Sequence, residues 1–233
     1  MNILLTGASK GIGYVLCRKF IYDGGHNIIA ISRTAEAFDK QLVSFDNSNT
    51  LSFSYLNLDL TKTNFKKSVL PLIVEKLKNI DIIINNAGLL INKPFEELTD
   101  NDFDDMFDIN VKSVFRLIRD LIPIINKGAH IVNISSIGGL QGSTKFPGLS
   151  LYSASKGAIA VLTECLAEEL KDKNISANAL ALGAVQTHML NKAFPNYKAP
   201  LSAKEMANFI FDFALNGQKY FNGKILPVSL STP

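Results

Sequence analysis

Short apolar runs alternate along this chain with longer segments of helical periodicity. The apolar runs predict buried parallel strands, which we place at residues 2–5, 26–33, 51–58, 80–88, 130–136 and 175–182, with a closing strand at 223–228. The periodic segments between them predict helices at 14–22, 61–79, 99–121, 152–170 and 202–215. This alternation indicates an α/β fold, a doubly wound parallel sheet of about seven strands with helices on both faces.

Polar residues mark where several of these elements begin or end. Residues 99–102 are suited to cap the helix that follows them, and residues 202–205 match a capping box. Residues 35–50 are polar and without period, which predicts a surface loop. Pro227 suits an edge strand. The helix at 99–121 is apolar on more than one face, so we expect it to pack on the sheet and also on a second subunit.

The first apolar run ends in a glycine-rich turn at residues 7–13, and a helix follows it. Glycine has no Cβ, so the backbone can approach a pyrophosphate closely, and the free N–H groups at the helix start attract its charge. The spacing G-x-x-x-G-x-G differs from the common dinucleotide fingerprint, G-x-G-x-x-G. The turn indicates a nucleotide-phosphate site, with a plain glycine turn as the alternative.

Two cations lie near the predicted ribose end of such a nucleotide. Arg33 ends the second predicted strand, where comparable folds place an acid for a ribose 2′-hydroxyl or a cation for a 2′-phosphate, and Lys10 lies inside the glycine turn. A phosphate carries about two negative charges and suits a planar guanidinium, so the pair favours NADP(H) over NAD(H). The alternative is two solvated surface cations. Asp59 is placed either to accept a bond from an adenine amino group or to start the next helix.

Tyr152 and Lys156 are four residues apart in a predicted helix, so their side chains lie on one face. A neighbouring ammonium favours the phenolate and lowers the pKa of a tyrosine. Such a pair can exchange a proton with a substrate oxygen. The same spacing is also common on helices without any catalytic role. Upstream, Ser135 and Ser136 end the fifth predicted strand on opposite faces, so only one of them can enter a site.

Composition limits the class of protein. The 233 residues are 47% hydrophobic and 19% charged, which is globular composition. No apolar run approaches the roughly 20 residues that cross a bilayer, and the N-terminus reads as a strand rather than a signal peptide, so we expect a cytoplasmic protein. The formal charge of +3 comes with scattered lysines and gives no case for nucleic acid. Cys17 and Cys165 lie far apart in predicted helices, so we expect neither a disulfide nor a metal site.

Four signatures follow one another in order: the turn at 6–13, Asn85-Asn86-Ala87-Gly88, Ile134-Ser135-Ser136 and Tyr152-Ser-Ala-Ser-Lys156. Together they resemble the short-chain dehydrogenase/reductase family over nearly the whole chain, and in particular its NADP-preferring members of the 3-oxoacyl reductase type. The resemblance implies one Rossmann-type NAD(P)-binding domain over residues 1–233. It also implies an enzyme that reduces a carbonyl to an alcohol by hydride transfer from NADPH.

The resemblance assigns a role to each matching residue. Tyr152 would be the general acid/base, Lys156 would lower its pKa and hold the nicotinamide ribose, and Ser136 would bond the substrate oxygen. Asn110 matches the family asparagine that positions a water leading towards the lysine. The residues implied to line the cofactor are Gly7, Ser9, Lys10, Gly11, Ile12, Gly13, Arg33, Asp59, Leu60, Asn86, Ala87, Gly88, Tyr152, Lys156, Val185 and Thr187.

The chain departs from the family pattern in three places. Leu182-Gly183 stands where the family usually has Pro-Gly, which bears on the geometry around Val185. The interval between the serine motif and the tyrosine is a few residues longer than usual, which predicts an insertion within 143–150. The tail from Gly223 lacks the common Asp-Gly-Gly ending, which bears on the usual subunit contact there.

The remaining expectations concern substrate and partners. Residues 188–201 should form a flap over the substrate carbonyl, and their mixed apolar character suits acyl thioesters, pterins, ketones, quinones or sugars. We expect a homodimer or homotetramer formed through the helices at 99–122 and 152–172. The competing hypothesis is an NADP(H)-binding sensor or scaffold that performs no chemistry, and the presence of all four catalytic side chains argues against it.

Overall fold

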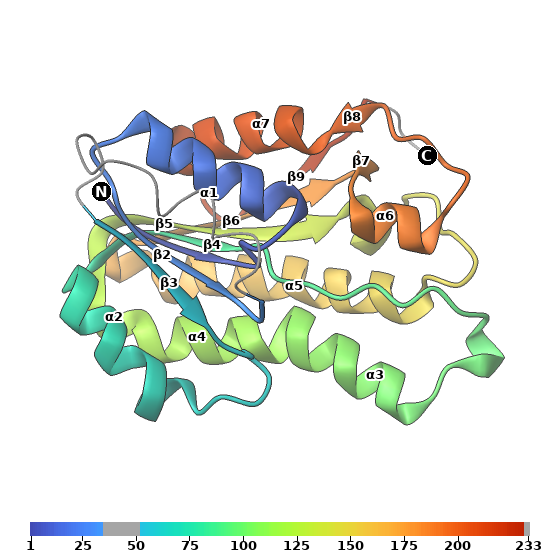
Figure 1. Ribbon diagram of the computed structural model, residues 1–233, viewed down its shortest axis with the longest axis horizontal. Helices are drawn as coiled ribbons and strands as arrows, with labels where there is room; N and C mark the ends of the chain where they lie inside the picture. Colours follow the sequence, from blue (N-terminus) through green and yellow to red (C-terminus); the bar gives the residue numbers. More distant parts are fainter. Residues whose placement is uncertain (35–51, 231–233) are drawn as a thin grey trace.

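A computed structural model describes residues 1–34 and 52–230, and its centre is a parallel sheet with helices on both faces (Figure 1). The sheet has seven strands in the order β3-β2-β1-β4-β5-β6-β9, and every neighbouring pair is parallel. The strands are β1 (Asn2–Thr6), β2 (Asn27–Ser32), β3 (Ser52–Asn57), β4 (Ile80–Asn85), β5 (Ile125–Ser136), β6 (Ser176–Leu182) and β9 (Ile225–Val228). The predicted doubly wound, Rossmann-type architecture is confirmed.

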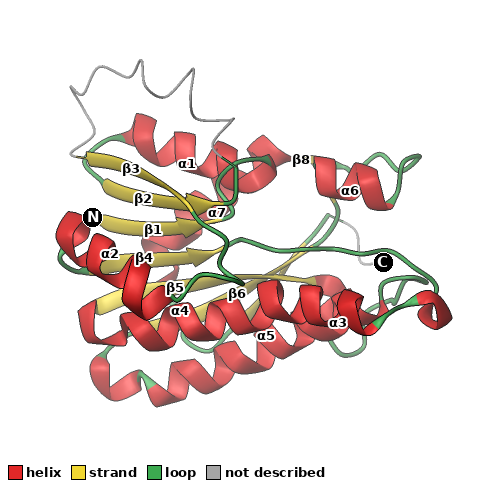
Figure 2. Cartoon of the chain, turned by 60° about the horizontal axis from the view of Figure 1, so that its bottom comes forward, coloured by secondary structure: helices red, strands yellow, loops and turns green. Residues whose placement is uncertain are grey.

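Two layers of helix cover this sheet (Figure 2). Helices α1 and α7 pack on one face, and α2, α4 and α5 pack on the other. The α-helices are α1 (Gly11–Asp23), α2 (Leu70–Leu77), α3 (Asp100–Phe107), α4 (Ser113–Leu121), α5 (Ser150–Glu169), α6 (His188–Ala193) and α7 (Ala203–Asn216). Two π-helical turns, η1 (Phe65–Val69) and η3 (Asp108–Lys112), precede α2 and α4, and short 3-10 turns lie at η2 (Phe95–Glu97), η4 (Ile122–Ile124), η5 (Ile137–Gly139), η6 (Lys171–Lys173) and η7 (Gly217–Lys219).

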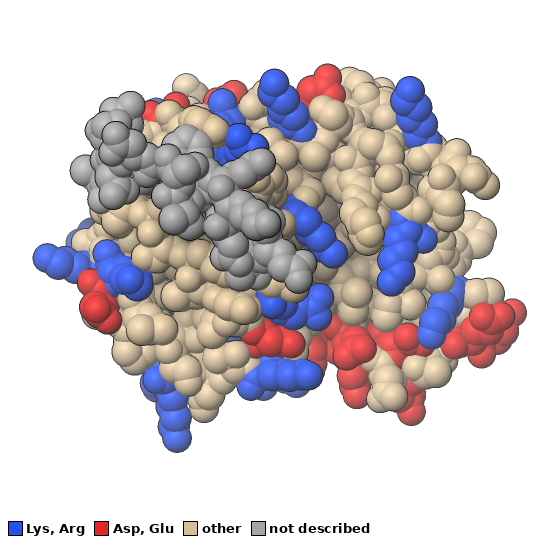
Figure 3. Space-filling model, viewed as in Figure 1, with Lys and Arg blue, Asp and Glu red and all other residues tan. Residues whose placement is uncertain are grey.

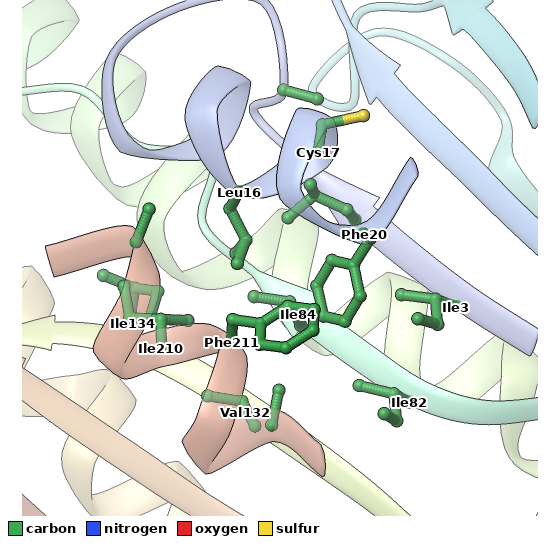
Figure 4. Close-up of a cluster of buried hydrophobic side chains, with 14 of the residues drawn as sticks. Ile3, Leu16, Cys17, Phe20, Ile82, Ile84, Val132, Ile134, Ile210 and Phe211 are labelled. Carbon is green, nitrogen blue, oxygen red and sulfur yellow. The ribbon is translucent and has the colours of Figure 1, made fainter. Parts of the chain in front are cut away.

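The core has one half on each face of the sheet because the strands are apolar on both sides. Ile82 and Ile84 in β4 point towards α1 and α7, whereas Ile83 between them points towards α2, α4 and α5. Under α1 and α7, Phe20 packs against Phe211 with ring centroids 4.7 Å apart (Figure 4). This burial keeps the sheet rigid beneath the residues at its carboxyl edge.

The structure corrects several predicted boundaries. The helix predicted at 61–79 begins only at η1, because the Asn64 side chain caps it by accepting from the Lys67 amide. The helix predicted at 99–121 is interrupted by the π turn η3, and strand β5 begins five residues before the predicted position, at Ile125. A further two-residue pair, β7 (Val185–Gln186) with β8 (Leu201–Ser202), was not predicted.

Other predictions about the chain are confirmed or lie outside what the structure describes. The predicted caps are present: Thr99 forms a capping box at α3, and Ser202 forms one with Glu205 at α7. Pro227 lies in β9, an outer strand of the sheet. The predicted loop at 35–50 lies outside the described residues. No helix within the described ranges is long and apolar enough to cross a membrane.

The strand order reverses between β1 and β4, which lie side by side. The chain leaves β1 towards β2 on one side, and it later leaves β4 towards β5 on the other. In open parallel sheets such a reversal leaves a crevice outside the carboxyl ends of the two strands, and ligands bind there. The glycine turn after β1 and the amide-rich segment after β4 both lie at this point.

Candidate active site

Two glycines in the turn after β1 are required by close contacts. A Cβ on Gly7 would lie 2.7 Å from the Cα atom of Ala87, and a Cβ on Gly13 would lie 2.2 Å from the Gly7 carbonyl oxygen. Gly7 also has φ +69°, which is left-handed backbone that favours glycine. The turn is therefore packed directly against the segment after β4.

Polar side chains hold this junction together. The Thr6 hydroxyl accepts bonds from the backbone amides of Asn86 and Ala87, each at 3.1 Å. In return, the Asn86 side chain donates to the carbonyl oxygens of Thr6 and Gly7, at 3.2 and 3.0 Å. The turns after β1 and β4 thus form one unit, in which each side supplies donors to the other.

The start of α1 meets the requirements of a phosphate site. Its N-cap residue, Lys10, makes no side-chain capping bond, so the Lys10 side chain leaves the amides of the first turn open. Gly11 has φ +58°, and a Cβ there would lie 3.6 Å from the Thr187 methyl carbon. An anion at this position would find free N–H groups and the positive end of the helix dipole, with Thr187 beside it.

The adenosine side of the crevice carries charges of both signs. Arg33 is exposed just after β2. The Asp59 carboxylate, after β3, accepts from the Thr61 amide at 2.9 Å and from the Thr61 hydroxyl at 2.7 Å. Burial raises the pKa of Asp59, but the bonds from Thr61 and the charges of Arg33 and Lys62 outweigh it, so the pKa lies below its ordinary value. Asp59 is therefore an ionised acceptor, and it does not cap the next helix.

Tyr152, Lys156 and Ser136 come together at the carboxyl edge, from α5 and β5. The Lys156 ammonium donates to the Ile134 carbonyl oxygen at 2.9 Å and lies 5.8 Å from the centre of the Tyr152 ring. Ser136 is close enough for its hydroxyl to hydrogen-bond the phenol and lower its pKa. The structure thus brings together three of the four side chains that the sequence predicts to be catalytic.

The pKa values of the pair differ from the expectation that Lys156 lowers the pKa of Tyr152. Burial raises the pKa of Tyr152 to about 12, and the bond with Ser136 opposes this only in part. Burial also lowers the pKa of Lys156 to about 8. The ammonium lies over the ring and is bound to a backbone carbonyl oxygen, so desolvation dominates both groups. The phenol is accordingly neutral, the form that can donate a proton.

Asn110, the fourth predicted catalytic residue, lies in the π turn η3 and is fully buried. Its carbonyl oxygen accepts from the Leu89 amide at 2.8 Å, and its amide group donates to the Leu89 carbonyl and to the Ser155 hydroxyl, each at 2.9 Å. Ser155 in turn donates to the Tyr152 carbonyl at 2.7 Å. A π turn inside a helix is frequent at functional sites, and this one directs an amide towards the tyrosine helix.

The two serines at the end of β5 have separate roles. Ser135 is buried and donates to the backbone carbonyl of Lys156 at 2.8 Å, which fixes α5 to the sheet. Ser136 accepts a bond from the Gly138 amide at 3.3 Å and lies on the phenol side. Only Ser136 enters the site, as the alternation of a strand requires.

The flap predicted at residues 188–201 contains helix α6, and its ends are joined. Val185 pairs with Leu201 in the short β7–β8 ladder. Inside this ring Gln186 bonds the Asn191 side chain and accepts from the Ala199 amide at 2.8 Å. The side chain of Thr187 caps α6 by accepting from the Leu190 amide. The flap thus starts beside the glycine turn, and its last residues pair with the strand that precedes it.

A separate cavity of about 780 Å³ lies across the η5 turn from Ser136. Its walls come from the turn η5, the start of α5 and the segment 145–150, which includes most of the predicted insertion. Lys145 shapes this segment by donating to the Gly138 and Leu140 carbonyl oxygens, at 2.8 and 2.5 Å. Neither Ser136 nor Tyr152 lines the cavity, but Gly138, whose amide bonds Ser136, does.

Sequence reasoning missed several residues that support the site. Three such residues each bond a distant segment: Thr6 bonds Asn86, Ser155 bonds Asn110 and Asn92 bonds Ala193. None of them was assigned a role from the sequence. Thr6 begins the turn signature at 6–13 and Ser155 lies inside the tyrosine motif, so their positions offered a signal, whereas Asn92 offered none. Among residues 1–34 and 52–230, no three histidines, cysteines or acids gather as metal ligands would.

Comparison with known proteins agrees with this arrangement. A family model described as short chain dehydrogenase matches residues 1–198. A cyclopentanol dehydrogenase of Comamonas sp. is 33% identical over 207 residues, which cover 88% of this chain and 79% of that protein. A 3-oxoacyl-(acyl-carrier-protein) reductase of Thermotoga maritima is 29% identical, with 97% of this chain and 94% of that protein covered.

Solved structures share the fold. A 3-ketoacyl-(acyl-carrier-protein) reductase from Brucella melitensis complexed with NADH has a TM-score of 0.84 at 23% identity, covering 97% of this chain and 96% of that chain. A short chain dehydrogenase from Burkholderia cenocepacia in complex with NADP has a TM-score of 0.85 at 22% identity, covering 97% and 95%.

The sheet order and the glycine turn define a Rossmann-type α/β protein. The match over residues 1–198 shows that the chain belongs to the short-chain dehydrogenase/reductase family, oxidoreductases of alcohol and carbonyl groups.

Proposed function

We propose that this protein is an NADPH-dependent reductase that converts a carbonyl to an alcohol within a single domain. The observation that carries the proposal is the placement of Tyr152, Ser136 and Lys156 at the carboxyl edge where the sheet order reverses. A proton donor and a hydroxyl for the substrate oxygen thus stand beside a turn suited to a dinucleotide.

The residues present fit a nicotinamide dinucleotide. Gly7 and Gly13 let the turn pack closely on the segment after β4, and Gly11 at the start of α1 faces Thr187, where a pyrophosphate would bind. Family members with this fold bind either form, NADH in one neighbour and NADP in another. The exposed cations Lys10 and Arg33 favour the phosphorylated form for this chain. When bound, the cofactor supplies the hydride.

The remaining chemistry belongs to the side chains of the chain. Ser136 donates a hydrogen bond to the substrate oxygen as negative charge develops on it, and the neutral Tyr152 phenol delivers the proton. Lys156, held by the Ile134 carbonyl, stabilises the phenolate that this transfer leaves. Asn110, through Ser155, fixes the part of α5 that carries the phenol.

The direct test is consumption of NADPH with a panel of carbonyl compounds: an acetoacetyl thioester, a diketone, a quinone and a pterin. The Tyr152→Phe variant should lose roughly 1,000-fold in turnover, because it keeps the ring and removes the proton. Its NADPH affinity should stay near that of the wild type. Binding of NADPH without consumption of any carbonyl would favour a sensor, and full turnover by the variant would remove Tyr152 from its role.

The exposed surface of α3 and α4 favours self-association. Phe103, Phe115 and Val161 on α3, α4 and α5 are exposed at 44%, 47% and 60%. Acidic side chains gather over α3 (Figure 3), whereas α4 carries Arg116 and an Arg119–Asp120 ion pair, so this surface offers charges of both signs to a second copy. We propose a homodimer or homotetramer through these helices. Sedimentation of a Phe115→Glu variant, which should be monomeric, tests it. The cytoplasmic location stays a prediction.

A further inference from the structure

The flap has little of its own to hold it in place. Helix α6 is six residues long and contains no buried residue. Segments with few buried contacts and exposed hydrogen bonds are those that open most easily. Ala199 and Leu201 anchor only the far end of the flap, so what holds α6 in position must come from specific polar contacts.

Contacts among residues 185–202 hold the base of the flap together. The β7–β8 pairing closes its base, and Gln186 bonds both Asn191 and the Ala199 amide. These contacts fix the shape of the flap. They do not fix its position against the opposite wall of the site, because Gln186 belongs to the same ring.

Asn92 supplies the contact to the opposite wall. It lies in the segment after β4, and its side-chain amide donates to the Ala193 carbonyl oxygen at the end of α6, at 2.8 Å. Its carbonyl oxygen faces Gly148, where a Cβ would lie only 1.9 Å away. Gly148 has φ +81° and its carbonyl accepts from the Lys93 amide at 3.2 Å. One side chain thus touches the flap and the loop before α5.

The segment that carries Asn92 is itself anchored. The Lys93 ammonium bonds Asp102 at 2.7 Å, and Asp102 belongs to the capping box of α3. Asn92 is exposed and has no part in the core. Its bond is therefore a polar link between α6, which buries no residue, and an anchored segment, and it can form and break without disturbing the fold.

We infer that Asn92 is a positioning residue, whose bond to the Ala193 carbonyl latches the flap against the segment after β4 and so governs access to the Tyr152 site. The latch holds the flap against the site and must break for product to leave. The kinetic consequence rests on the proposed reductase function, whereas the opening of the flap does not.

Limited proteolysis can measure how often the flap opens. The Lys192–Ala193 peptide bond lies next to the Ala193 carbonyl group that Asn92 binds, and Lys192 is exposed. Trypsin cleaves such a bond in proportion to the open population when opening is fast. Asn92→Ala and Asn92→Asp, which keeps the shape but cannot donate, should each be cut there about fivefold faster than the wild type.

The second lysine of the flap and a neighbouring variant are the controls. Cleavage after Lys198 should change less, because the Ala199 amide is held by Gln186. Lys93→Met removes the ion pair with Asp102 but keeps the bond from the Lys93 amide to the Gly148 carbonyl oxygen, so cleavage after Lys192 should rise less than in the Asn92 variants. Cleavage at wild-type rates in both Asn92 variants, or equal acceleration in Lys93→Met, would overturn the inference.

Steady-state kinetics separate positioning from general loss of structure. Both Asn92 variants should show a KM for the carbonyl raised about fivefold with kcat equal or higher, and an unchanged NADPH affinity. A fall in kcat with unchanged KM would contradict the latch. If no carbonyl is turned over at all, the proposed function fails while the proteolysis still decides whether Asn92 holds the flap.

Discussion

The two halves of the site are held together by different kinds of contact. At the glycine turn, backbone lies against backbone: Gly7 is packed on the Cα atom of Ala87, and the Thr6 and Asn86 side chains are bonded in both directions. At the flap, the exposed Asn92 side chain connects the segment after β4 to α6, which buries no residue. The first half can hold only one shape, and the second can change shape at small cost. A rigid half suits a cofactor of fixed shape, and an adaptable half suits substrates of different shapes.

The largest expected effect is at Gly7. Gly7→Ala should lower the free energy of unfolding by about 2–4 kcal/mol and weaken NADPH binding about 100-fold, because no backbone atom of Ala87 can move aside. Gly25→Ala is the matched control, since Gly25 also has φ +69° but nothing within 4 Å. It should cost only about 1 kcal/mol, from the backbone conformation. Thermal unfolding and NADPH titration measure both; equal losses would mean that the contact is unimportant.

The pH profile probes Lys156, where the two halves meet. Burial lowers the pKa of Lys156 to about 8, so the ammonium is present below that pH and is lost above it. Reduction should fall up to about tenfold per pH unit above 8, and Lys156→Arg, which stays charged, should lack this decline. Since the unfolded chain holds the proton to pH 10.5, stability should rise between about pH 8 and 10.5. A rate independent of pH up to 10 would contradict this role.

Arg33 tests the cofactor preference of the rigid half. Arg33→Ala should reduce the preference for NADPH over NADH about tenfold, because one exposed charge-assisted bond to a phosphate is lost. Titration of both cofactors measures it. Lys62, which also lies near Asp59, is the control cation, and Lys62→Ala should leave the preference unchanged. If Arg33→Ala and Lys62→Ala showed the same ratio of NADPH to NADH affinity, the 2′-phosphate of NADPH would bind away from Arg33.

The smallest effect is expected in the flap half, at Gly148. Gly148→Ala has a nominal clash more severe than that at Gly7, 1.9 Å, but the atom it meets is the end of the exposed Asn92 side chain, which can rotate away. Stability should fall by only about 1 kcal/mol and NADPH affinity should not change. The KM for the carbonyl should rise about threefold, as the Asn92 contact is displaced. A collapse of stability here would show that this half is as rigid as the other.

Sequence reasoning succeeded where local pattern and required geometry coincide. Apolar runs predicted the sheet because strands buried on both faces must be apolar throughout, and the glycines at 7 and 13 are imposed by backbone contacts. Tyr152, Ser136, Lys156 and Asn110 were predicted, and the structure brings them to the same edge.

The parts that escaped prediction depend on distant neighbours. The pKa of Tyr152 follows from burial and from the position of the ammonium, neither of which spacing reveals. The π turn at Asn110 leaves no periodic signal over five residues, and β7 and β8 are too short to show alternation. Asn92 meets Ala193 across 101 positions of sequence, so nothing local marks it.

The β7–β8 pairing joins the two ends of the flap at one point of the scaffold. A segment that leaves and re-enters at neighbouring positions can be lengthened, shortened or replaced wholesale with little strain on what lies beneath, since closing a longer loop costs little. Transplanting the corresponding stretch of a relative between Thr187 and Leu201, with Thr187 kept, would then be a route to new substrate ranges that leaves nucleotide recognition untouched.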